Sequence, residues 1–129
     1  MAVQDVLDVS QLDVATGGDA ALTREVLGIF RHQAEIWGRM LDPHEDARVW
    51  ADACHTVKGA ARSIGATALG DACEAGETRG RDGDVTVAEA SVLLATVKEK
   101  IAEALEAIAH LDHQLALSED LSASNASNS

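Results

Sequence analysis

His55 is the side chain of this sequence best placed to act as a nucleophile. Helical spacing separates it from the apolar stripe of Trp50, Cys54 and Val57, so its imidazole should point toward water. An unperturbed imidazole keeps a free ring nitrogen near neutral pH and can form a covalent intermediate. Surface histidines without a role are common, so the neighbours of His55 must decide between the two interpretations.

Two cations follow His55 at helical offsets. Lys58 lies one turn further along and can place an ammonium beside a phosphoryl group on His55, and Arg62 lies one turn beyond Lys58 on the same face. The chain is otherwise strongly acidic, with 10 Lys and Arg against 22 Asp and Glu. For Arg62, pairing with Asp52 and glutamates on a solvated helix face is an equally good interpretation.

The segment after His55 contains two glycines, Gly59 and Gly65. Gly59 is an unusual choice inside a helix, because glycine costs about 1 kcal/mol relative to alanine there. Beside an exposed His55 it removes bulk where a partner's active site would have to close. Gly65 interrupts the helix, and for Gly65 and Gly76 we expect a structural role in close packing between helices.

The segment from Ala53 to Ala66 closely resembles the signature of histidine-containing phosphotransfer (HPt) domains. The shared pattern is His55, an apolar residue at plus two, Lys58-Gly59, small residues, and then Ile64-Gly65. The resemblance extends over about residues 7 to 115. The sequence departs from it at Ala60, where many members have Ser, and at Gly76, where a larger apolar residue often precedes the glutamate matched by Glu77.

This resemblance implies roles for three residues on the polar face. His55 would be the phosphoacceptor, Lys58 would favour the phosphorylated form, and Gly59 would leave room for a response-regulator receiver domain. By their place on the same helix face, we also expect Arg62 to help stabilise the phosphoryl group and Asp52 and Arg48 to belong to the receiver-docking surface.

Capping and periodicity predict the elements that position these residues. Asp19 caps a helix over 20–41, Asp42-Pro43-His44-Glu45 starts one over 43–64, Thr67 caps one over 67–80, and the capping box Thr86 to Glu89 starts one over 86–117. A further short helix is possible between residues 6 and 15. We therefore expect an all-α, antiparallel four-helix bundle in a single domain, residues 1–117, followed by a disordered Ser/Asn-rich tail, residues 118–129.

Composition restricts the partners and the location. The formal net charge of −12 disfavours binding to nucleic acid or to anionic membranes. There is no run of 18 apolar residues and no leader-like start, so we expect a cytoplasmic protein. Cys54 and Cys73 have no metal or redox spacing and should be reduced core residues.

Nucleotide and metal chemistry have no sequence support. No phosphate-cradling glycine motif occurs, and the chain is too short for a kinase ATP-binding domain. His110 and His113 lie one turn apart but lack a third ligand. We expect no cofactor and no metal site, so that phosphate comes from another protein and the metal needed for transfer belongs to the receiver.

The sequence thus predicts a phosphorelay intermediate, a carrier and not an enzyme. It would accept phosphate on His55 from a receiver aspartate or a hybrid histidine kinase and pass it to another receiver. A monomer is expected, because four helices of one chain can close a core and the His-Glu and Arg-Thr-Pro pattern of kinase dimerisation helices is absent. Two alternatives remain open: the phosphoacceptor domain of a histidine kinase served by a separate ATP-binding domain, and a receiver-docking module that carries no phosphate.

Overall fold

The computed structural model describes residues 2–127, and side chains as far as residue 121. This part of the chain is entirely helical. A 3-10 helix, η1 (Val3–Asp5), precedes five α-helices: α1 (Val9–Thr16), α2 (Ala20–Met40), α3 (Ala47–Ser63), α4 (Thr67–Asp82) and α5 (Val87–Ser127). The predicted all-α fold with an additional N-terminal helix is therefore confirmed.

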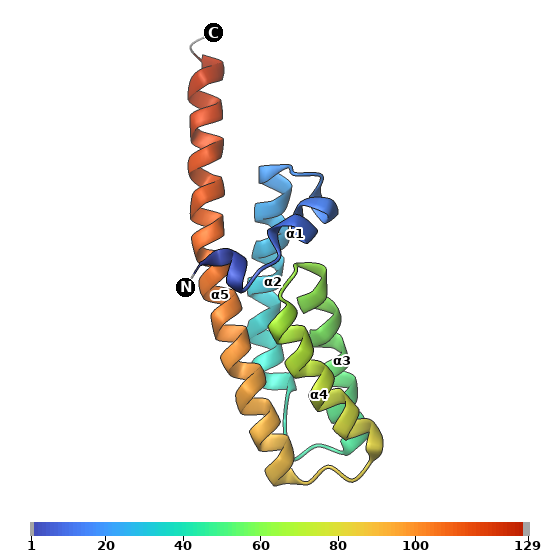
Figure 1. Cartoon of the computed structure of the whole chain (residues 1–129). Helices are drawn as coiled ribbons and strands as arrows, with labels where there is room; N and C mark the ends of the chain where they lie inside the picture. Colours follow the sequence, from blue (N-terminus) through green and yellow to red (C-terminus); the bar gives the residue numbers. More distant parts are fainter. Residues whose placement is uncertain (1, 128–129) are drawn as a thin grey trace.

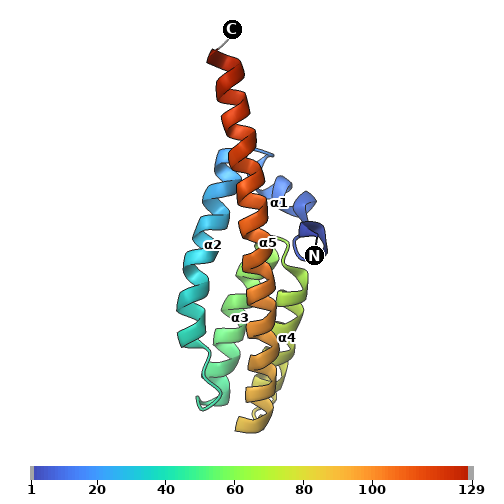
Figure 2. The ribbon, with the colours of Figure 1, turned by 90° about the vertical axis from the view of Figure 1, so that its left-hand side faces the viewer.

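The four long helices α2 to α5 alternate in direction and form an elongated antiparallel bundle (Figures 1 and 2). The most extensive interface joins α3 to α4, while α5 packs on both α2 and α4. The short helix α1 lies across the end of the bundle at which α2 begins (Figure 1). The candidate nucleophile thus lies on a hairpin, α3 and α4, that is braced from one side by the other two helices.

Two of the predicted helix starts agree with the structure. The Asp19 carboxylate accepts a hydrogen bond from the backbone N–H of Leu22 at 2.9 Å and starts α2. The Thr86 hydroxyl accepts one from the N–H of Glu89 at 3.1 Å and starts α5. In both cases the side chain satisfies a donor that the first helical turn leaves without a partner.

The predicted start of α3 at Pro43 is wrong. Residues 42–45 form a turn, in which the Asp42 carboxylate accepts from the N–H of His44 at 2.9 Å and the Asp42 carbonyl accepts from that of Glu45 at 3.2 Å. A second aspartate, Asp46, then caps the helix by accepting from the N–H of Arg48 at 2.8 Å. The helix α4 begins at residue 67 as predicted, but Thr67 is its first residue and not its cap, and no side-chain hydrogen bond caps this end.

The last helix is longer than the sequence predicted. Where we expected a disordered tail from residue 118, α5 continues to Ser127, and residues 128–129 of that tail lie outside the described part. Arg24 on α2 pairs with Asp112 at 3.0 Å and with Glu119 at 2.6 Å, which ties this extension to the bundle. No Gly or Pro occurs there, and Ser and Asn each cost a helix less than about 1 kcal/mol.

The core lies between the four long helices. Trp50 is its largest fully buried side chain and donates from its indole Nε1 to the carbonyl of Gly76 at 2.9 Å. Phe30 and Trp37 on α2 pack edge to face, with ring centroids 5.1 Å apart. Cys54 and Cys73 are both buried and unbridged, as predicted.

Gly65 has a different structural role from the predicted packing between helices. It forms the turn from α3 to α4 with φ +77°, which glycine adopts at little cost, and its backbone carbonyl accepts from the N–H of Asp8 at 2.9 Å. A Cβ on Gly65 would lie 2.6 Å from the Asp8 carbonyl oxygen. The glycine is thus required by the turn and by the close approach of the N-terminal segment.

Within residues 2–127, no helix is both long and apolar enough to span a membrane.

Candidate functional site

Small residues of α4 let it approach α3 unusually closely. A Cβ added to Gly76 would lie 2.9 Å from the Cys54 Sγ, and one added to Gly80 would lie 2.9 Å from both the Ala47 carbonyl oxygen and the Trp50 ring. These contacts confirm the packing role expected for Gly76. Because the helices are so close, polar side chains of α4 reach those on the exposed face of α3.

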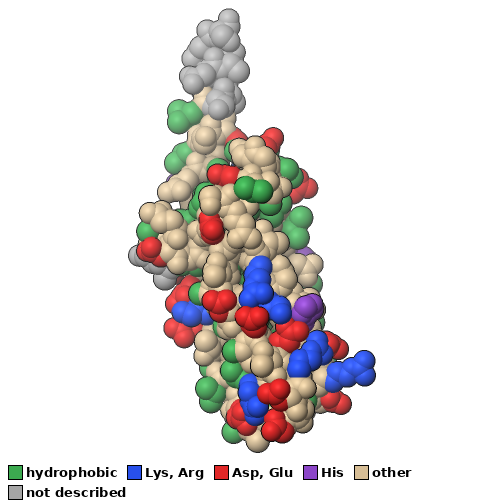
Figure 3. All heavy atoms as spheres, turned by 45° about the vertical axis from the view of Figure 1, so that its right-hand side comes forward, with side chains coloured by type: hydrophobic (Ala, Val, Ile, Leu, Met, Phe, Trp, Pro, Cys, Tyr) green, Lys and Arg blue, Asp and Glu red, His purple; other side chains and the backbone are tan. Residues whose placement is uncertain are grey.

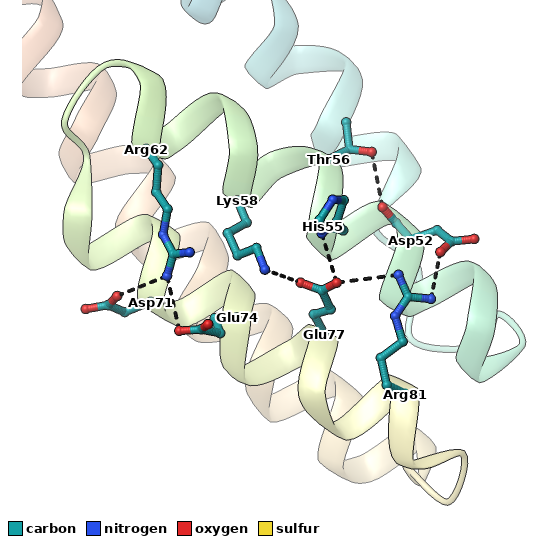
Figure 4. A network of polar contacts seen from close by, with 9 residues as sticks. All are labelled: Asp52, His55, Thr56, Lys58, Arg62, Asp71, Glu74, Glu77 and Arg81. Atoms are coloured by element: carbon teal, nitrogen blue, oxygen red, sulfur yellow. Dashed lines mark hydrogen bonds and ion pairs between the residues drawn. The ribbon is translucent and has the colours of Figure 1, made fainter.

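His55 projects from this face of α3, as the sequence predicted. Its side chain is 63% exposed, and its Nδ1 lies 2.9 Å from Oε2 of Glu77 on α4 (Figure 4). A carboxylate in this position favours the tautomer that carries the proton on Nδ1. The other ring nitrogen, Nε2, is then the one with a free lone pair.

Glu77 is shared between His55 and Lys58. Its side chain is only 13% exposed, and its Oε1 lies 2.6 Å from the Lys58 Nζ, which is itself 17% exposed. Burial acts to raise the pKa of Glu77, but the Lys58 ammonium and His55 outweigh it and hold this pKa below the ordinary value. Glu77 is therefore ionised at neutral pH and fixes the positions of both neighbours.

Arg81 is a second cation at this site beside Lys58, and it lies one turn beyond Glu77 on α4. Its guanidinium pairs with the Asp52 carboxylate at 2.7 Å and lies 3.4 Å from Glu77 Oε2 (Figure 4). Asp52 thus serves within the chain as the partner of Arg81. Arg81 is not among the site residues predicted from the sequence, although its i, i+4 spacing from Glu77 is typical of an ion pair along a helix.

The structure does not bring Arg62 to His55. Its guanidinium is directed toward α4, 3.1 Å from Glu74 and 3.8 Å from Asp71 (Figure 4). This pairing matches the alternative interpretation of Arg62 as part of a solvated helix face. Lys58 and Arg81 are the cations that share Glu77 with His55.

Gly59 and Arg48 lie on the same exposed face of α3 as His55. A Cβ added to Gly59 would meet no atom within 4 Å, so no packing contact within the described chain requires a glycine there. Arg48 is exposed two turns before His55. Neither residue contacts His55 in the structure, and their predicted role in docking concerns a partner.

No cluster of three or more potential metal ligands occurs among the described residues.

Comparisons with known proteins agree with this site, in which a lysine and a glycine lie one turn beyond an exposed histidine. The model of the Hpt domain family matches residues 21–111. The chain belongs to this family. Among solved structures, this Hpt protein is similar to the histidine phosphotransferase ShpA from Caulobacter crescentus, with a TM-score of 0.65 and 39% sequence identity over 88% of this chain and 96% of that one. No curated protein matches its sequence. Membership in the Hpt family supports a carrier role in a phosphorelay.

Proposed function

We propose that this Hpt protein is a phosphorelay intermediate that carries phosphate on Nε2 of His55. The donor is a receiver-domain aspartate, alone or within a hybrid histidine kinase, and the acceptor is the aspartate of a response-regulator receiver. The observation that carries the proposal is the contact of His55 Nδ1 with Glu77, which leaves Nε2 as the nucleophile on a 63% exposed side chain.

The transfer is a displacement at phosphorus. The Nε2 lone pair attacks the phosphorus of the aspartyl phosphate, and the P–O bond breaks with its electrons going to the leaving carboxylate. The phosphorylated imidazole retains the proton on Nδ1 and carries a positive charge on the ring, which the Glu77 carboxylate offsets at 2.9 Å. In the second transfer, another receiver's carboxylate attacks phosphorus and the N–P bond breaks.

Lys58 and Glu77 act by positioning and by charge. The Lys58 ammonium lies against Glu77 and one helical turn from His55, so it can neutralise phosphoryl oxygens without a large movement. Catalysis of this kind depends on orientation and on fixed charges more than on proton transfer. We propose no such role for Arg62, which pairs with Glu74 and Asp71.

The test is transfer of labelled phosphate from a panel of phosphorylated receiver domains. We expect an acid-labile, base-stable phosphate on the wild type and none on His55→Gln with unchanged helical circular dichroism. His113→Gln, on another helix, serves as the matched control and should be labelled normally. Labelling of His55→Gln would refute the assignment of the phosphoacceptor.

The role of Glu77 has a separate spectroscopic test. In 15N NMR spectra, His55 of the unphosphorylated wild type should show the tautomer protonated on Nδ1, and Glu77→Ala should lose this preference. We expect Glu77→Ala also to slow transfer, with Glu77→Gln intermediate because its amide oxygen still accepts a hydrogen bond. An unchanged tautomer in Glu77→Ala would show that Glu77 does not orient the ring.

The same samples distinguish the kinase-domain alternative. Incubation with ATP and Mg²⁺ alone should produce no phosphohistidine. If the chain were the phosphoacceptor domain of a histidine kinase, adding that kinase's separate catalytic domain to the same incubation would label His55. We also expect a monomer near 13.5 kDa by light scattering, with or without phosphate.

A further inference from the structure

A cleft next to the His55 site is lined by two arginines from different helices. Its volume is about 420 Å³, and its walls are Asp46, Ala47, Arg48, Gly80, Arg81 and Gly83. It lies where α3 begins and α4 ends, and Arg81 links it to the site through Asp52 and Glu77. The cleft therefore adjoins the face that a domain docking on His55 would approach.

The two arginines differ in what holds them. Arg81 is engaged by the Asp52 and Glu77 carboxylates, and the other cations of this face, Lys58 and Arg62, are likewise paired. Arg48 forms no ion pair with any side chain of the described part of the chain, although acidic residues outnumber basic ones by 22 to 10. Arg48 can thus accept an external carboxylate without first losing an internal partner.

The backbone of the cleft keeps the guanidinium accessible. Gly83 contributes no side chain to its wall, and a Cβ there would meet nothing within 4 Å, whereas the Cβ position of Gly80 faces Ala47 and Trp50 of α3. Among the described residues, Asp46 is the only acidic one that lines the cleft, and its carboxylate accepts a hydrogen bond from the backbone N–H of Arg48 as the helix cap. Lys and Arg side chains are prominent on the lower part of the face in Figure 3, among carboxylates.

We propose that this cleft receives an Asp or Glu side chain of the receiver domain, with Arg48 as its direct contact and a determinant of receiver specificity. The inference rests on the proposed function and names the chemistry of its partner. The planar guanidinium of Arg48 matches a carboxylate through two parallel hydrogen bonds, whereas the charge of Arg81 is already offset by Asp52 and Glu77. Outside such places the charge of −12 would repel an acidic surface.

Charge reversal at Arg48 tests the proposal. Arg48→Glu should fold normally, because a glutamate in the first turn of a helix is favourable. The matched control is Lys98→Glu, which changes the net charge equally at an exposed position of α5, a helix that packs on α2 and α4. Melting by circular dichroism verifies both variants.

The readout is the initial rate of transfer from a phosphorylated receiver that serves the wild type as donor. Arg48→Glu should raise KM for this receiver about tenfold, in keeping with loss of one charge pair at an interface, and leave kcat within about twofold. Lys98→Glu should change neither by more than about twofold. Added NaCl should lower kcat/KM of the wild type more steeply than that of Arg48→Ala.

Three outcomes would overturn the proposal. One is equal KM values for Arg48→Glu and Lys98→Glu, and another is a fall in kcat without a change in KM, which would place Arg48 in the chemistry and not in docking. In both, transfer to the wild type persists, so the proposed function stands while this inference fails. If no receiver donates phosphate to the wild type, the proposed function fails and the inference falls with it.

Discussion

Replacing Gly59 by alanine should stabilise the protein and slow its function at the same time. Gly59 lies inside α3, where glycine costs a helix about 0.8–1.0 kcal/mol relative to alanine. The added Cβ would meet no atom within 4 Å, so no strain offsets this gain. For a single domain of this size, 1 kcal/mol corresponds to a rise in Tm of about 4 °C.

The methyl group would project one turn from His55, on the face that a receiver must cover. Transfer from a phosphorylated receiver should therefore slow in Gly59→Ala and slow more strongly in Gly59→Leu, which should also melt within a few degrees of the wild type. Thermal unfolding and a transfer time course on the same samples measure both effects. A clear fall in Tm for Gly59→Ala, or a normal transfer rate for Gly59→Leu, would refute the reasoning.

Three further predictions concern the α3–α4 interface. Gly80→Ala should lower Tm, the opposite of the first substitution, because its Cβ would lie 2.9 Å from the Ala47 carbonyl oxygen, and overpacking of about 1–3 kcal/mol exceeds the gain in helix propensity; an unchanged Tm would contradict this. The lowered pKa of Glu77 means that its ionisation contributes stability above the ordinary value of 4.5, and this is lost as pH falls through the folded-state pKa. Urea unfolding of Glu77→Gln should accordingly depend less on pH below 4.5 than that of the wild type, and equal dependence would argue against the lowered pKa. Burial raises the pKa of both Cys54 and Cys73 to about 12, so a thiol reagent at pH 8 should react slowly with the folded protein and fast in urea; fast reaction without urea would show that the helices separate readily.

The sequence predicts the bundle well because each long helix carries an apolar repeat. Periodicity alone, however, does not say which repeat is buried. On α2 the apolar residues form two neighbouring stripes, of which the structure buries Leu27, Phe30, Ala34 and Trp37 and leaves Leu22, Ile29, Ile36 and Met40 exposed. Helix ends depend on competing caps, which is why Asp46 and not Asp42 starts α3.

The sequence predicts the part of the site that lies on α3 but not the contacts that come from α4. Spacing along one helix predicts that His55, Lys58 and Gly59 share a face, and the structure agrees. The contacts of Glu77 and Arg81 come from the opposing helix, and their register against α3 is set by how closely Gly76 and Gly80 allow the backbones to approach. That distance is a property of packing, which a residue pattern does not contain.

The close pairing of α3 with α4 has a consequence for how such a protein can diverge. Asp52, His55, Lys58, Glu77 and Arg81 all belong to these two consecutive helices, so the reactive geometry is encoded in one uninterrupted stretch of chain. Within the described residues, α2 and α5 supply the rest of the core but no ion pair to the imidazole. Exposed positions of the same two helices that take no part in this network, Arg48 among them, are therefore free to vary between duplicated copies, and new pairings with receivers can arise while the reactive residues are inherited unchanged.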